Sequence, residues 1–461
     1  MTSARGTLRD SLEHADRLEQ QPPLYFLLLN LWLRLHRSIG VARLLSLPAA
    51  VFGVLLTART FVRVSREESR STIPIILMIL LGCPLTMYLA TEARSYALQF
   101  AGGALLASSM AAIHARKSAT ATDVASLLAA GVFLSYLNYI AGFAAVWVTV
   151  VLLLTRSLTG RQVAVIAGCG LVLVSPLLWT VQRHVQTHQD LQEHGGTFDG
   201  VLRVFYWLPR MAIPYAIARG PWQSILGGAV AVAVAAGLVY RHRTGQKTLP
   251  SPPFLAAAGL TIALFLAVGL LTGTVLVQER YFSAFLPFLW IATWLLLRFS
   301  LGWIPTVALL LVLAAGGCHR IAALHGPGIR RGDWRRIAAR INQDPPQPIF
   351  VFPPQEALVL GVELGDPARV NAFPKDYDGS RFVQASDYVV DNSEGLRTRV
   401  AQRTGGGRFW MAYTTPPIAP PEIRQPMDIV RTFIEQRCTV EGEFPFNGSR
   451  LLQLRLKPDG H

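Results

Sequence analysis

The sequence predicts a polytopic α-helical membrane protein that ends in a small α/β domain. Of its 461 residues, 51% are hydrophobic and only 15% are charged, whereas soluble globular proteins carry about 25% charged residues. Apolar runs long enough to cross a bilayer recur between residues 42 and 320 and then stop. We therefore expect a transmembrane domain at 42–320, an external α/β domain at 321–461 and an external N-terminal segment at 1–41.

About ten apolar runs are candidate spans, although the fourth and fifth could form one kinked helix. They cover residues 42–62, 73–91, 96–113, 124–137, 139–155, 163–181, 223–240, 254–277, 282–297 and 303–318. The apolar stretch at 23–36 is too short to span comfortably. We expect it to form a helix at the external interface, where Trp32, Arg34 and His36 suit the headgroup level.

Positive charges occupy alternate loops between these runs, as cytoplasmic loops do. The loops carry Arg63, Arg66 and Arg70; Arg116 and Lys117; Arg156 and Arg161; Arg241, Arg243 and Lys247; and Arg298. The loop at 92–95, the turn at 278–281 and both chain ends are then external. Membrane topology thus explains the net charge of +15, and no clustered basic face or stacking motif predicts nucleic-acid binding.

Short strands and helices are predicted after residue 324. Strands are expected at 349–352, 408–413, 438–444 and 450–456, and helices at 333–342, 355–364 and 427–436. Asp333 is expected to N-cap the first of these helices. Asn447 and Gly448 suit a hairpin turn better than a glycosylated sequon. Neither a GxGxxG nor a Walker A motif is present, so nucleotide binding has no support.

Two groups of polar residues lie at predicted external helix ends. Glu92, Arg94 and Tyr96 lie where one span ends and the next begins, and Arg280 and Tyr281 open a later span. Ionisable residues at such depth are costly and often functional, and an arginine can hold a phosphate through two charge-assisted hydrogen bonds. The alternatives stay open: Glu92 and Arg94 could cap helix ends, and Arg280 could snorkel beside an interfacial tyrosine.

Nothing in the sequence predicts a metal site or a cofactor. His184, His188 and His194 share one predicted loop, but no carboxylate converges on them at helical spacing. The four cysteines contain no CxxC pair. We expect neither a metal nor a cofactor to be required.

Five short segments follow one another in a suggestive order. They are QPPLYFLLL at 21–29, RLLSLP at 43–48, EARSYAL at 92–98, RY at 280–281 and DWR at 333–335. Together they resemble segments of bacterial GT-C membrane glycosyltransferases similar to protein O-mannosyltransferases. The resemblance runs from about residue 8 to the end of the chain.

The resemblance implies a GT-C-type fold and transfer of a sugar from a polyprenyl-phosphate carrier. The acceptor would be an envelope glycan, lipid or protein on the external face. Because the donor's phosphate gains charge as it leaves, Arg94 and Arg280 would stabilise it, and Glu92 would orient an arginine or a sugar hydroxyl. The implied substrate-binding residues are Tyr25, Tyr96, Asn138 and Tyr281.

The chain departs from the family pattern in three places. The family begins with a membrane helix and an acidic external loop whose aspartate is the presumed base, and this chain starts after that point. Either the missing part lies upstream of Met1, which we expect, or the chain is a degenerate member of the family. Gln21 and Asn138 each replace a family histidine. If the base lies within the chain, the candidates are Asp10, Glu13 and Asp16, although a solvated tail is the commoner explanation for such residues.

A function of another class remains open at this stage. The protein could be a transporter or a membrane scaffold whose external domain binds envelope glycans. Transporters place ionisable residues near the middle of their helices, whereas the charges here collect at the predicted external helix ends. This distribution favours chemistry on a lipid headgroup at the inner membrane.

The charge pattern makes a prediction about topology. A reporter fused at His461 should be external, and one inserted in the loop at 241–247 should be cytoplasmic, because positively charged loops stay inside. Alkaline phosphatase and green fluorescent protein fusions distinguish the two sides. Reporters found on the same side would contradict the predicted architecture.

Overall fold

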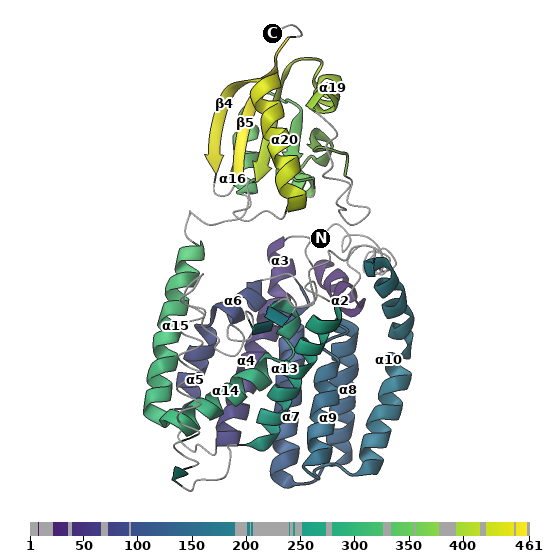
Figure 1. Cartoon of the computed structure of the whole chain (residues 1–461), viewed down its shortest axis with the longest axis vertical. Helices are drawn as coiled ribbons and strands as arrows, with labels where there is room; N and C mark the ends of the chain where they lie inside the picture. Colours follow the sequence, from purple (N-terminus) through teal and green to yellow (C-terminus); the bar gives the residue numbers. More distant parts are fainter. Residues whose placement is uncertain are drawn as a thin grey trace. The chain divides into compact units, whose positions relative to one another are not determined.

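The computed structural model describes most of the chain in two units. The described residues are 8, 22–35, 39–65, 72–91, 94–189, 201–202, 204–205, 239, 243–244, 251–272, 279–325, 333–354, 356–377, 393–414, 421–446 and 449–458. A helical unit, Met1–Arg320, precedes a smaller unit, Ile321–His461. Figure 1 shows the helices of the first unit and the sheet and helices of the second. Each unit contains a hydrophobic core built from its own residues.

The helical unit is a bundle of helices of unequal length. Its elements are α2 (Leu24–Leu33), α3 (Ile39–Leu44), α4 (Ser46–Ser65), α5 (Thr72–Leu81), α6 (Pro84–Thr91), α7 (Tyr96–Arg116), α8 (Ala121–Leu137), α9 (Phe143–Leu154), α10 (Gly160–Gln189), α13 (Pro252–Thr272), the 3-10 turn η3 (Glu279–Phe282), α14 (Leu286–Leu301) and α15 (Trp303–His325). Within the described ranges, four helical stretches are long and apolar enough to cross a membrane: Val41–Ser65, Tyr96–Arg116, Gly160–Thr180 and Pro252–Leu271. The predicted span at 223–240 lies outside the described residues.

The predicted span at 73–91 is a bent pair of helices rather than one rod. Pro84 has no N–H to continue the helix, and the stretches Ile73–Leu81 and Leu85–Thr91 meet at 68°. The carbonyl of Leu80 accepts a hydrogen bond from the N–H of Cys83 at 3.2 Å instead. The break therefore leaves no orphaned carbonyl at Leu80, which suits a position inside a bilayer.

The fourth and fifth predicted spans are separate helices that pack side by side, α8 and α9. They contain 17 and 12 residues, fewer than a full span needs. Both are short because the backbone of Asn138 is extended, with φ −164° and ψ 131°, and ends α8. A turn over residues 139–142 then leads into α9.

The predicted interfacial helix at 23–36 is α2. Tyr25, Leu29 and Leu33 are buried in a cluster that also contains Leu137 and Leu98, from α8 and α7. One side of α2 is thus covered by the bundle. Its position at the membrane interface stays a prediction.

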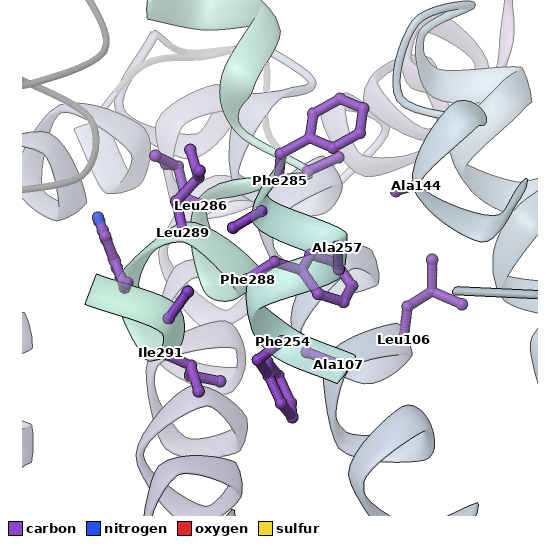
Figure 2. Packing of buried hydrophobic residues seen from close by; sticks show 14 of the residues in the cluster. Leu106, Ala107, Ala144, Phe254, Ala257, Phe285, Leu286, Phe288, Leu289 and Ile291 are labelled. Atoms are coloured by element: carbon purple, nitrogen blue, oxygen red, sulfur yellow. The ribbon is translucent and has the colours of Figure 1, made fainter. Parts of the chain in front are cut away.

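The core of the helical unit surrounds α14. Trp290 and Trp294 on this helix are 0% and 1% exposed. Phe288 packs against Phe254 of α13, with ring centroids 6.3 Å apart. Small side chains of α7 and α9, such as Ala107 and Ala144, belong to the same cluster (Figure 2). Large rings thus fill the space that small residues on neighbouring helices leave open.

The C-terminal unit is a five-stranded sheet with helices on both faces. Its elements are α16 (Trp334–Ile341), β1 (Ile349–Phe352), α17 (Glu356–Leu364), the 3-10 turn η4 (Pro367–Arg369), β2 (Val370–Ala372), α19 (Ser393–Thr404), β3 (Arg408–Thr414), α20 (Pro421–Arg437), β4 (Cys438–Phe446) and β5 (Ser449–Leu456). The strand order is β2-β1-β3-β5-β4. Strand β1 runs parallel to β2 and β3, and β5 runs antiparallel to β3 and β4.

Alternating side chains of the central strands supply the two cores of this sheet. Phe350 and Phe409 pack with residues of α19 and α20, such as Phe433. Val351 and Trp410 pack on the opposite face with residues of α16 and α17. The short strand β2 and helix α19 were not predicted from the sequence.

One predicted detail of this unit, the capping of α16 by Asp333, differs in the structure. Asp333 occupies the N-cap position of α16, but its carboxylate accepts a hydrogen bond from Arg336 at 3.2 Å rather than from a helix N–H. Cys438 begins β4 in a buried position, and burial raises the pKa of its thiol to about 12. A thiol with so high a pKa stays protonated near neutral pH and is a poor nucleophile or metal ligand.

The contact between α7 and the start of α14 makes a prediction about stability. A Cβ added to Gly103 would lie 1.9 Å from the carbonyl oxygen of Ala284, whereas one added to Gly168 on α10 would meet nothing within 4 Å. Gly103→Ala should therefore lower the free energy of unfolding by about 1–3 kcal/mol through overpacking. Gly168→Ala should be neutral or slightly stabilising. Thermal unfolding in detergent compares the two, and equal behaviour would contradict the close contact.

Candidate active site

The N-terminal end of α7 carries the first predicted group of site residues. Arg94 lies in a bend and is partly buried, Ser95 is 1% exposed, and α7 begins at Tyr96, which is 2% exposed. Glu92 lies outside the described residues. The structure thus places Arg94 directly before a buried helix start.

A chain of buried side chains links this helix start to the second predicted group. Gln99 donates a hydrogen bond from Nε2 to Oγ of Ser95 at 2.8 Å. Its Oε1 accepts one from Oγ of Ser283 at 2.7 Å. Ser283 directly follows η3, the turn that contains Arg280 and Tyr281. Two segments that are 184 residues apart in sequence, measured from Gln99 to Ser283, are therefore in direct contact.

The second group is only partly described. The backbone of Glu279 and Arg280 belongs to η3, but their side chains lie outside the described part of the chain. Tyr281 is partly buried and packs against the large core cluster, which includes Tyr96. The predicted phosphate contact of Arg280 therefore stays a prediction.

Tyr96 lies in the core of the helical unit, and its hydroxyl is buried. Its ring stacks on that of Tyr88, with centroids 6.3 Å apart and planes 16° apart. Among the described residues, no group forms a hydrogen bond with its hydroxyl. A buried hydroxyl without a partner is costly, so this atom is available to a ligand that reaches it.

The other two predicted substrate-binding residues lie at the same end of α7. Tyr25 is buried in the cluster that contains Leu98, two residues along from Tyr96. Asn138 is also buried, and its Oδ1 accepts a hydrogen bond from the N–H of Ile140 at 2.9 Å. The side-chain oxygen of Asn138 thus stabilises the turn between α8 and α9.

Hydrogen bonds also join the loops that lie at the other end of α7. Nε2 of Gln162 donates to the carbonyl of Ala119, just after α7 ends, at 2.8 Å. Arg298, near the end of α14, donates to the carbonyl of Ser65 at the end of α4, at 3.0 Å. Predicted cytoplasmic segments thus contact one another at this end, and at the other end Ser95 and Ser283, which lie beside the predicted external turns, are joined through Gln99. Which set faces the cytoplasm stays a prediction.

The chain was compared with known proteins and structures. No family model and no curated protein matches it. The crystal structure of ArnT from Cupriavidus metallidurans bound to undecaprenyl phosphate matches over 94% of this chain and 88% of that one, with a TM-score of 0.53 and 14% identity. The same protein in the apo state matches with a TM-score of 0.40 and 15% identity, over 98% of this chain and 91% of that one. An Archaeoglobus fulgidus oligosaccharyltransferase in complex with Zn and sulfate has a TM-score of 0.43 and 12% identity, over 86% of this chain and 59% of that one.

The match to lipid-bound ArnT extends over nearly all of both chains. The chain has the fold of a GT-C-type membrane glycosyltransferase. It is accordingly a multi-pass α-helical membrane protein with a small C-terminal α/β domain. At 14% identity the likeness shows the fold alone.

Within the GT-C fold, Gln99 and Ser283 are the site residues that sequence reasoning missed. Both lie in or beside predicted apolar spans, where a buried polar side chain needs a partner. A signal was available, since Gln99 follows Ser95 by four residues and so shares its helix face. The sequence carried no sign that Ser283 completes the chain of hydrogen bonds.

Several weaker candidates lie outside the part of the chain that the structure describes in full. Asp10, Glu13, Asp16 and His194 lie outside the described residues, and α10 is described at His184 and His188 only for its backbone. No group of three potential metal ligands occurs among the residues that the structure describes.

A comparison of Tyr96 with Tyr136 tests whether the hydroxyl of Tyr96 forms a hydrogen bond in the ligand-free protein. Tyr136 donates a hydrogen bond to the carbonyl of Leu173 at 3.0 Å. Tyr136→Phe should therefore lower the free energy of unfolding by about 0.5–1.5 kcal/mol, whereas Tyr96→Phe should leave it unchanged or raise it. Thermal unfolding of the ligand-free protein measures both. A clear loss of stability in Tyr96→Phe would show that its hydroxyl already has a partner.

Proposed function

We propose that the protein transfers a sugar from a polyprenyl-phosphate carrier to an envelope glycan, lipid or protein on the external face of the inner membrane. The observation that carries the proposal is the hydrogen-bonded chain Ser95–Gln99–Ser283. It brings the segments of Arg94 and Arg280 together at one end of the helical unit. The undecaprenyl phosphate bound to ArnT, which has the same fold, supports a polyprenyl-phosphate donor.

The reaction would break the bond between the sugar's anomeric carbon and a phosphate oxygen. The electron pair leaves with that oxygen, so negative charge grows on the phosphate. Arg94 and Arg280 would stabilise this charge through planar, charge-assisted hydrogen bonds. The contact between arginine and phosphate strengthens towards the transition state. Hydrogen-bond donors of this kind accelerate a reaction because they stabilise the transition state more than the bound substrate.

The remaining site residues would bind and orient the substrates. The buried hydroxyl of Tyr96 is available to hydrogen-bond the donor, and Tyr281, Tyr25 and Asn138 would line the same end of the bundle. The acceptor oxygen attacks the anomeric carbon and gives its proton to a carboxylate. Of the carboxylates in this chain, Glu92 is the closest to Arg94 in sequence. Its role would be to orient that arginine or a sugar hydroxyl.

The proposed phosphate contact is tested by replacing its arginines. Arg280→Gln and Arg94→Gln should each lower kcat about a hundredfold or more, the usual loss when a donor to a developing anion is removed. Arg280→Lys should be only partly active, because lysine keeps the charge but not the planar fork. Turnover of a fluorescent polyprenyl-phosphate sugar by full-length protein in nanodiscs provides the measurement.

Arg298→Gln is the matched control, because Arg298 is an arginine that bonds Ser65 at the other end of α14. It should lose some stability and keep its kcat. Near-native kcat in folded Arg280→Gln and Arg94→Gln would eliminate the phosphate contact. Binding of envelope glycans without any sugar transfer would instead support the scaffold or transporter alternative.

A further inference from the structure

Gln99 uses both ends of its amide inside an otherwise apolar core. It is 0% exposed, as is Ser283, and Ser95 is 1% exposed. Neighbouring members of the core are large and apolar, among them Phe100 and Phe282. The described chain therefore contains a polar path, one residue wide, in which both ends of the Gln99 amide are hydrogen-bonded inside a hydrophobic cluster.

Stability alone does not explain this path. A buried hydrogen bond contributes little net stabilisation, because its groups give up bonds to water, and apolar groups of the same shape serve a core at least as well. A buried amide is nevertheless costly unless every bond is made, so it tolerates only one arrangement of its neighbours. Gln99 therefore specifies geometry more than it adds stability.

The geometry it specifies is the register between two segments. Ser95, Gln99 and Gly103 follow one another at intervals of four residues and form a stripe along one face of α7. Gly103 lets the backbone of Ala284 approach closely, and Gln99 bonds the preceding residue, Ser283. The close contact sets the distance between the segments, and the hydrogen bonds set their position along the helix axis.

We propose that Gln99 is a positioning residue for the donor-phosphate site, an inference that rests on the proposed function. It touches no donor itself. It acts through Ser95, which follows Arg94, and through Ser283, which follows the turn carrying Arg280. Holding these two segments in one register keeps two cations at a fixed spacing for a single phosphate.

The test uses a variant that keeps the volume of Gln99 and removes its hydrogen bonds. Gln99→Met should weaken binding of undecaprenyl phosphate, measured with full-length protein in nanodiscs, about tenfold, the effect expected when a positioning hydrogen bond is lost. Ser283→Ala should weaken it in the same direction and is the second variant if Gln99→Met does not fold. The double variant should lose no more than Gln99→Met alone, because the two residues share one interaction.

Gln162→Met is the matched control. Gln162 is also a glutamine that joins two segments, through the carbonyl of Ala119, but at the other end of α7. The Gln162→Met substitution should lower thermal stability. It should leave the affinity for undecaprenyl phosphate within about twofold of the wild-type value. A purely structural role for Gln99 predicts that both variants lose stability and neither changes binding.

The outcomes separate this inference from the function on which it rests. Wild-type protein that does not bind undecaprenyl phosphate overturns the proposed function and the inference with it. Wild-type protein that binds, with unchanged binding in folded Gln99→Met or Ser283→Ala, overturns the inference alone. Equal loss of binding in Gln99→Met and Gln162→Met also overturns it, because the effect then follows stability and not position.

Discussion

Close contact between α7 and the residues that lead into α14 is the constraint on which the helical unit depends. Within a bilayer, helices gain little from hiding apolar surface, and they associate where small residues let their backbones approach. Gly103 provides such a point against Ala284, Gly102 admits the side chain of Leu134, and Gly53 on α4 admits the ring of Phe100. Among the described elements, helix α7 contacts α4, α6, α8, α9 and α14. Any change in its position would disturb these neighbours together.

The sequence predicted the broad organisation of the fold because that organisation follows from solvent. A helix that crosses a bilayer needs a long apolar run, and a strand with one face in water needs alternating polar and apolar residues. Strand β5, in which buried and more exposed residues largely alternate, appeared close to its predicted bounds for this reason, whereas β1 and β3 are mostly continuous buried runs. The short strand β2 depends on its pairing with β1, and no local pattern predicted it. The break before Pro84 is a local effect of the missing proline N–H, although the predicted span ran through it. The turn after Asn138 lies at the predicted boundary between the fourth and fifth spans.

The residues of the candidate site could be predicted only where their own type was unusual for their position in the sequence. Arg94 and Tyr96 stood out because charged and polar groups are rare beside apolar spans. Asn138 also stood out, but the structure uses its side-chain oxygen in a turn. Gln99 and Ser283 were not predicted as site residues. The role of a buried polar side chain depends on its hydrogen-bond partner, and these two partners are 184 residues apart in sequence. Long-range partners of this kind become visible only when the chain is folded.

The separate cores of the two units bear on cooperativity. Trp290 and Trp294 lie in the core of the helical unit, whereas Trp334 and Trp410 lie in that of the sheet. Domains with cores of their own need not unfold in one step, and a single melting temperature is then not well defined. Tryptophan fluorescence of the whole chain would blend the two transitions. A probe confined to one unit reports on the transition of that unit by itself.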